Sequence, residues 1–193
     1  MELCIFVKNF PKVDSKNKRF LAFLARFFGV YAAMSLLYAG YLRWSVPNGA
    51  VLDPFSIWIG EQATSIAGVF NVVVTYLPTV GEPSYTFWVE GSSLARMVEG
   101  CNALSVVILF WAFLVAFKGT WSRTIGFGLA GTFVLFIMNS LRIAVLLWAL
   151  KLYPAQEHLL HGVVFPVIIY GTVFLLWVSW VNYFADYAKE KRA

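Results

Sequence analysis

Long apolar runs separated by short polar and charged segments dominate the pattern along the chain. The ranges 20–42, 124–150 and 161–184 are apolar over most of their length. As helices rising about 1.5 Å per residue, all three are long enough to cross a hydrocarbon core about 30 Å thick. The pattern therefore predicts membrane-spanning helices at these three ranges.

A fourth apolar run covers 102–117 and is shorter than the others. A helix over this range is expected to stand nearly upright, or to begin slightly earlier, if it is to cross the bilayer. With this run included, the sequence predicts an all-α, polytopic membrane bundle with about four full spans.

The chain between the first run and the run at 102–117 is mixed in character. Residues 55–79 are mostly apolar but contain the polar side chains Glu61, Gln62 and Thr64. We interpret this segment as a re-entrant or interfacial helix. The alternation of polar and apolar residues over 84–89 indicates a short strand or hairpin, placed in a loop before the helix at 102–117.

Basic residues gather beside the apolar runs and predict the orientation of the chain. The segment 1–19, the loop 118–123 and the tail 185–193 hold most of the 15 lysines and arginines, whereas acidic residues outnumber basic ones over 81–99. Cytoplasmic segments carry an excess of Lys and Arg, so 1–19, 118–123 and 185–193 are expected inside and 81–99 outside. The net charge of +5 thus reflects membrane orientation and does not indicate a nucleic-acid partner.

Composition supports one membrane domain over 1–193. The chain is 60% hydrophobic and only 13% charged, whereas soluble domains carry about 25% charged residues. Its two cysteines, Cys4 and Cys101, are expected on opposite sides of the membrane. A disulfide between them is therefore not expected.

Three residue types that can take part in catalysis are expected at the outer ends of the spans. With a rise of about 1.5 Å per residue, Cys101 lies about 26 Å and Arg142 about 27 Å above the inner boundary. His161 lies about 35 Å and His158 about 39 Å above it. The pattern therefore places a thiol, a guanidinium and an imidazole in one outer layer.

Arg142 is the strongest physical signal, because the apolar run continues beyond it to Leu150. An arginine at mid-bilayer costs about 2.5–3.5 kcal/mol on insertion scales. One interpretation is an anchor that snorkels from a helix end, but Lys151 is the more natural anchor. We therefore expect Arg142 to face the bundle interior and to have a partner there.

Cys101 and the two histidines suggest nucleophilic chemistry. Cys101 begins a predicted helix, where the helix dipole and a nearby arginine favour a thiolate, although membrane cysteines also occur as small buried apolar residues. His158 and His161 are three residues apart and share a helix face. They form an interfacial pair or supply a general base for the cysteine. With only Glu157 as a nearby carboxylate, they make a poor metal site.

Three motifs resemble those of the exosortase/archaeosortase family. Residues 99–105 (Glu-Gly-Cys-Asn-Ala-Leu-Ser) resemble its cysteine motif, and residues 139–143 (Asn-Ser-Leu-Arg-Ile) resemble its arginine motif. Residues 158–171 resemble its histidine-bearing last span. The short chain and its closing stretch 174–181 look most like the exosortase F subtype.

The resemblance implies a multi-pass cysteine protease or transpeptidase of the bacterial inner membrane, with an extracytoplasmic site. Its partners would be membrane proteins whose C-terminal sorting signal consists of a short motif, a transmembrane helix and a basic tail. These substrates would dock laterally through the lipid bilayer. No metal or other cofactor is implied, and both hydrolysis and transfer to an amine acceptor stay open, as does the oligomeric state.

The family motifs also suggest a role for each site residue. Cys101 would be the nucleophile and Arg142 the stabiliser of the thiolate or oxyanion. The depth argument favours His161 as general base, whereas the spacing to a following glycine favours His158. Asn139 and Asn102 would be supporting residues. The alternative function is a non-catalytic membrane assembly or transport factor in which Arg142 pairs with an acidic group of a partner.

Overall fold

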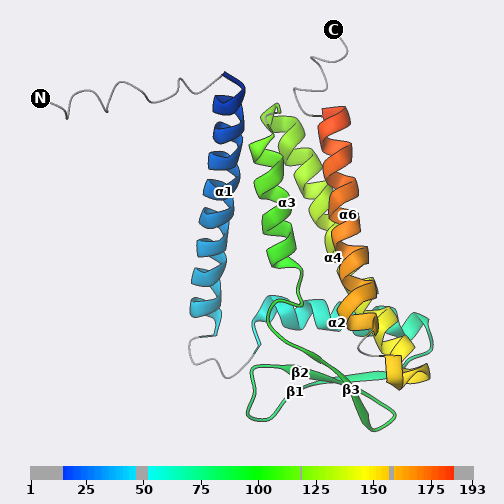
Figure 1. Cartoon of the computed structure of the whole chain (residues 1–193). Coiled ribbons are helices and arrows are strands. Elements are labelled where there is room, and N and C mark those ends of the chain that lie inside the picture. Colours follow the sequence, from blue (N-terminus) through cyan, green and yellow to red (C-terminus); the bar gives the residue numbers. More distant parts are fainter. Residues whose placement is uncertain (1–14, 47–51, 118, 157–158, 185–193) are drawn as a thin grey trace, which may run out of the picture.

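The computed structural model of the chain consists of a helical bundle and a cap across one of its ends (Figure 1). In the cap, a crosswise helix lies between the bundle and a small sheet. The structure describes residues 15–46, 52–117, 119–156 and 159–184. The bundle helices are α1 (Ser15–Ser45), α3 (Leu104–Ala116), α4 (Trp121–Leu152) and α6 (Phe165–Ser179), and the cap comprises α2 (Pro54–Val69), β1 (Val74–Pro78), β2 (Tyr85–Val89) and β3 (Ser92–Met97).

Three helices of the described chain are long and apolar enough to cross a membrane: Asn17–Ser45, Trp121–Leu152 and Gly162–Phe184. They coincide with the runs predicted at 20–42, 124–150 and 161–184. The last of them contains α6 with a π-helical turn at each end, Leu160–Val164 and Trp180–Phe184. A mostly helical, membrane-associated chain is therefore confirmed.

The run at 102–117 departs from the expectation of a fourth full span. Its helix, α3, begins at Leu104 and has 13 residues. At about 1.5 Å per residue it is about 20 Å long, which is shorter than a hydrocarbon core of about 30 Å. The residues before it form a turn instead of another helical turn, and this turn places Cys101 at the junction with the cap.

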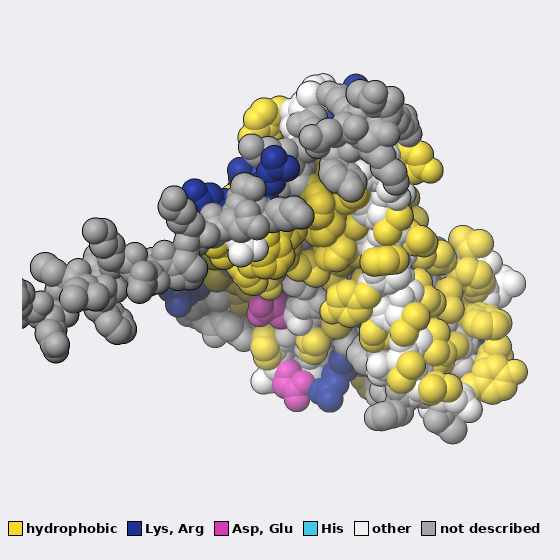
Figure 2. Space-filling view, turned by 45° about the horizontal axis from the view of Figure 1, so that its top comes forward, with side chains coloured by type: hydrophobic (Ala, Val, Ile, Leu, Met, Phe, Trp, Pro, Cys, Tyr) yellow, Lys and Arg dark blue, Asp and Glu magenta, His cyan; other side chains and the backbone are white. Residues whose placement is uncertain are grey.

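Hydrophobic side chains cover much of the face of the molecule that Figure 2 shows. Helix α4 is the central helix, because half of its most apolar stretch is buried, whereas none of the corresponding stretch of α1 is. An exposed apolar surface of this extent is typical of contact with lipid. Large apolar side chains exposed on these helices include Phe28, Leu36, Leu37, Phe133, Val167, Phe174 and Leu175.

Glycines on α4 allow α3 to pack closely against it. A Cβ atom on Gly131 would lie 2.4 Å from the ring of Phe110, and one on Gly128 would lie 2.2 Å from the ring of Trp111. The indole N–H of Trp111 also donates to Thr132 Oγ1 at 2.9 Å. Small residues with interhelical hydrogen bonds are the usual means of helix packing in membranes.

Helix α2 is shorter than the helix predicted over 55–79. Asp53 caps its start by accepting a hydrogen bond from the Ser56 N–H at 3.0 Å, with Pro54 in the first turn. The helix ends at Val69, and Asn71 follows with a positive φ of 58°. Farther along the predicted range, residues 74–78 form a strand, β1, because their backbone pairs with β2.

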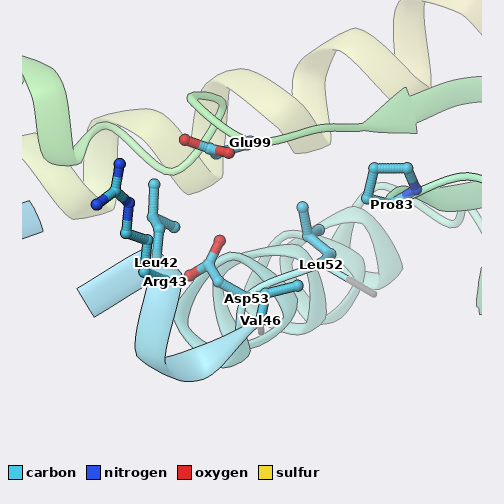
Figure 3. A pocket seen from close by; sticks show the side chains of 7 residues that line it. All are labelled: Leu42, Arg43, Val46, Leu52, Asp53, Pro83 and Glu99. Atoms are coloured by element: carbon cyan, nitrogen blue, oxygen red, sulfur yellow. The ribbon is translucent and has the colours of Figure 1, made fainter. Parts of the chain in front are cut away.

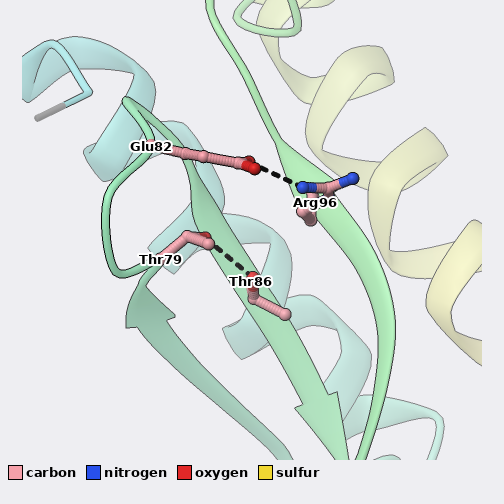
Figure 4. Close-up of polar contacts among 4 residues, drawn as sticks. All are labelled: Thr79, Glu82, Thr86 and Arg96. Carbon is pink, nitrogen blue, oxygen red and sulfur yellow. Dashed lines mark hydrogen bonds and ion pairs between the residues drawn. The ribbon is translucent and has the colours of Figure 1, made fainter. Parts of the chain in front are cut away.

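The polar segment before α3 forms a three-stranded antiparallel sheet in the order β1-β2-β3, which is larger than the strand or hairpin expected at 84–89. Figure 4 shows two polar contacts at the end where β1 turns into β2. The hydroxyls of Thr79 and Thr86 lie 2.8 Å apart, and Arg96 on β3 pairs with Glu82 at 2.6 Å. Because the ion pair is exposed, its contribution to stability is small.

Two clusters of buried residues hold the bundle and cap together. One joins α2 and the sheet to one half of α4, and includes Ile59, Phe87 and Leu147. The other joins α3, the opposite half of α4 and the last span, and includes Phe110 and Trp180. Helix α4 contributes to both clusters, so it positions the cap relative to the bundle.

Gly131→Ala is expected to destabilise the protein, because Phe110 is fully buried and has no room to move away from a new methyl group. Overpacking of this kind costs about 1–3 kcal/mol. The matched control is Gly126→Ala on the open side of α4, which should be neutral or stabilising by up to about 1 kcal/mol. Unfolding by SDS in mixed micelles measures both, and equal midpoints for the two variants would contradict the packing described.

Candidate active site

Cys101 lies in the tight turn that connects β3 to α3. Its N–H donates to the carbonyl of Val98 at 3.1 Å. Gly100, with a φ of +91°, adopts a left-handed conformation that permits the reversal. The thiol is free, and the residue is half-buried. This placement leaves the sulfur at the start of a helix and at the boundary between bundle and cap.

The side chain of Asn102 connects three helices around this turn. It is fully buried, and its Nδ2 donates to Tyr38 Oη on α1 at 3.1 Å and to Ser56 Oγ on α2 at 2.8 Å. Its Oδ1 accepts from the N–H of Leu104, the first residue of α3, at 2.9 Å. Asn102 thus holds the starts of α2 and α3 and the outer part of α1 together, whereas its supporting role in catalysis stays a prediction.

Asn139 on α4 holds the same turn from the other side. Its side chain is 1% exposed, and its Nδ2 donates to the backbone carbonyl of Cys101 at 2.8 Å. A buried amide in apolar surroundings keeps such a partner, because leaving the amide without a hydrogen bond costs about 1–3 kcal/mol of stability. The hydrogen bond ties the position of Cys101 to α4.

Arg142 lies about one turn beyond Asn139 on α4 and is half-buried. Its guanidinium is within electrostatic range of the Cys101 thiol and the Tyr170 hydroxyl. Its Nε is buried and has no hydrogen-bond partner among the described residues. The structure thus joins Cys101 to Asn139 by a hydrogen bond and places Arg142 about one turn farther along α4, with its buried Nε left for another group.

Of the two histidines, only the backbone of His161 belongs to the part of the chain that the structure describes. His158 lies outside the described residues. His161 falls in the π-helical turn Leu160–Val164, and its side chain is also outside the described part. Leu160, its neighbour, packs against a buried cluster that includes Leu146 on α4, and Leu94 on β3 packs against the same cluster, so this turn lies at the cap end of the bundle. The approach of either imidazole to Cys101 stays a prediction.

Tyr76 on β1 is a polar neighbour of the site that the sequence did not reveal. Its hydroxyl is buried without a hydrogen-bond partner among the described residues, and its ring lies against Gly60 of α2. Burial, reinforced by Tyr85, raises the pKa of Tyr76 well above its usual range, so the phenol keeps its proton at neutral pH. The hydroxyl is within electrostatic range of Cys101. It is therefore a protonated hydroxyl of the cap that approaches the turn only to electrostatic range, with no hydrogen bond to Cys101 among the described contacts.

Metal chemistry has no evident site in the part of the chain that the structure describes. Within it, no group of three or more His, Cys, Asp or Glu residues is arranged to hold an ion. The chemical groups near Cys101 are instead amides, a guanidinium and a phenol. Such groups bind and polarise carbonyl and carboxylate oxygens.

Asn102→Ala is expected to lower the free energy of unfolding by about 2–3 kcal/mol, since it removes three hydrogen bonds worth about 1 kcal/mol each. Asn182→Ala, at an exposed asparagine near the end of the last span, is the matched control and should change stability by less than about 0.5 kcal/mol. SDS titration of both purified variants measures the difference. Similar losses in the two variants would show that the Asn102 network does not support the fold.

Comparisons of the chain with protein-family models, with curated proteins and with solved structures found no match. The resemblance to the exosortase/archaeosortase family therefore rests on the motifs around Cys101, Arg142 and the histidines alone.

Proposed function

We propose that the chain is a membrane-embedded cysteine protease or transpeptidase of the exosortase type. It would cleave C-terminal sorting signals at the outer face of the bacterial inner membrane. The observation that carries the proposal is the hydrogen bond from Asn139 to the Cys101 carbonyl, with Arg142 one turn away and within electrostatic range of the thiol. This hydrogen bond supports the proposal because it fixes the turn that carries the thiol relative to the helix that carries the guanidinium.

The proposed chemistry uses these groups in a fixed order. The thiolate of Cys101 attacks the scissile carbonyl carbon, and a histidine, His161 or His158, holds the thiol proton. Arg142 stabilises the thiolate or the oxyanion that develops. The C–N bond then breaks, the amine leaves with the proton, and a thioester forms on Cys101. Water or an amine acceptor resolves this thioester and regenerates the thiol.

Two features of the fold support a site at the membrane–water boundary. Helix α3 is about 20 Å long, so a turn at its outer end lies in the outer half of a hydrocarbon core about 30 Å thick when the helix starts at the inner edge. The cap covers this turn, and the apolar helix surfaces beside it suit lateral docking of a substrate helix. Both termini would lie in the cytoplasm, as the charge distribution favours.

One observation also favours the second candidate function, a non-catalytic assembly or transport factor. The Nε of Arg142 is buried without a hydrogen-bond partner among the described residues, and it could donate a hydrogen bond to an acidic group of a partner protein. Such a factor would need the guanidinium but not the sulfur. Substitution of the two residues therefore separates the two functions.

Cys101→Ala and Cys101→Ser are expected to reduce cleavage of a co-expressed candidate substrate by at least about a thousandfold, because the nucleophile is lost. Cys4→Ser is the matched control and should retain cleavage. Immunoblots of substrate processing, with mass spectrometry of a thioester on Cys101, measure the outcome. Processing by Cys101→Ala would disprove the assignment of the nucleophile. A protein that tolerates Cys101→Ser but loses its cellular role with Arg142→Ala would be an assembly factor.

The proposed orientation is tested with a membrane-impermeant thiol reagent applied to intact spheroplasts. Cys101 should be labelled from outside, since it is free and partly exposed at the cap end, and Cys4 should react only after permeabilisation. Single-cysteine variants allow each site to be followed by gel shift. The reverse labelling pattern would place the cap in the cytoplasm.

A further inference from the structure

A cavity of about 270 Å³ lies beside the turn that carries Cys101. It is formed by the end of α1, the start of α2 and the turn before α3, as Figure 3 shows. At about 30 Å³ per water molecule, this volume corresponds to about nine waters. Its lining combines apolar side chains with three charged ones: Leu42, Val46, Leu52 and Pro83 with Arg43, Asp53 and Glu99.

Asp53 is the most unusual of these residues, because its charged side chain is only 2% exposed. Its Oδ1 accepts hydrogen bonds from the Ser56 N–H at 3.0 Å and from Tyr41 Oη at 3.3 Å. Its Oδ2 is buried and has no hydrogen-bond partner among the described residues. A buried carboxylate oxygen without a donor is costly. Since Asp53 lines the cavity and points into it (Figure 3), a bound ligand can supply the missing donor.

The other charged groups of the cavity define the charge of that ligand. Glu99 reaches the cavity from the turn before α3, and Arg43 lies at its edge on α1. Among the described residues, neither the two carboxylates nor the guanidinium takes part in an ion pair. Two negative charges against one positive charge favour a cation, and two carboxylates fall short of a metal-binding group of three.

We propose that this cavity binds a primary ammonium group carried on a short aliphatic stem. The ammonium would donate to Asp53 Oδ2 and lie close to Glu99, since it has three donors and no acceptor. The stem would contact the apolar lining, including Leu42 and Leu52. A lysine side chain and the amine of a lipid headgroup share this chemistry. The proposal concerns binding alone and does not depend on cleavage at Cys101.

The test uses the full chain in nanodiscs of phosphatidylcholine, with n-pentylammonium as the probe and 1-pentanol as its uncharged analogue. Calorimetric titration should detect n-pentylammonium binding and no comparable binding of 1-pentanol. Asp53→Asn should weaken binding at least about tenfold, because the charge-assisted hydrogen bond is lost. Asparagine is as good a helix N-cap as aspartate, so the start of α2 should be preserved.

Glu99→Gln provides a second variant at an exposed position, and it should weaken binding several-fold. Glu61→Gln, an exposed carboxylate on α2 that does not line the cavity, is the matched control and should bind as the unchanged chain does. Two further arms identify the natural source of the amine. Loss of probe binding in discs that contain phosphatidylethanolamine would indicate a lipid headgroup, and competition by N-acetyl-lysine amide would indicate a peptide.

Three results would overturn the proposal. The first is an unchanged chain that fails to bind n-pentylammonium, and the second is one that binds 1-pentanol equally well. The third is equal binding by Asp53→Asn, or by Glu99→Gln should Asp53→Asn fail to fold. None of these results bears on Cys101, so the proposed cleavage reaction stands or falls separately.

Discussion

Two buried asparagine amides hold the turn on which the rest of the structure depends. Asn102 hydrogen-bonds to Tyr38 and Ser56, while Asn139 donates to the carbonyl of Cys101. In an apolar bundle such amides cannot hydrogen-bond to water, so losing these protein partners would leave buried polar groups unsatisfied. They join α1, α2, α3 and α4 at one place, and they position Cys101 relative to helices that are distant from it in sequence.

The short length of α3 and the presence of the cap are related. Helix α3 begins only at Leu104, so the residues before it are not helical. Their polar backbone groups need other hydrogen-bond partners near the membrane boundary. The sheet provides them through its own ladder, and α2 covers the bundle end by packing on α4. The site is therefore sheltered by protein on one side while lipid-facing helices flank it on the other.

Three buried polar atoms of the cap and of α4 lack a hydrogen-bond partner among the described residues: the Nε of Arg142, the hydroxyl of Tyr76 and Oδ2 of Asp53. Of these three, two are donors and one is an acceptor, and they come from α4, β1 and the start of α2. Side-chain atoms of three further residues are also buried without a partner there: Ser84, Trp177 and Trp180. Native structures leave few such atoms unsatisfied, and the roles proposed for Arg142 and Asp53 each give one of them a partner.

Hydropathy and charge alone predicted the three long helices and a similar depth for Cys101 and Arg142, because helix length and rise are local properties. Tertiary structure decided the rest. The apolar range 55–79 divides into α2 and β1 because Tyr76 pairs with Phe87 on β2, a non-local contact that periodicity does not encode. Likewise, the partners of Asn102, the burial of Tyr76 and the cavity at Asp53 arise only when α1, α2 and the turn at Glu99 meet. Side-chain hydrogen bonds and cavities depend on contacts between segments that are distant in sequence. The length of a hydrophobic segment can be read from the sequence of that segment alone.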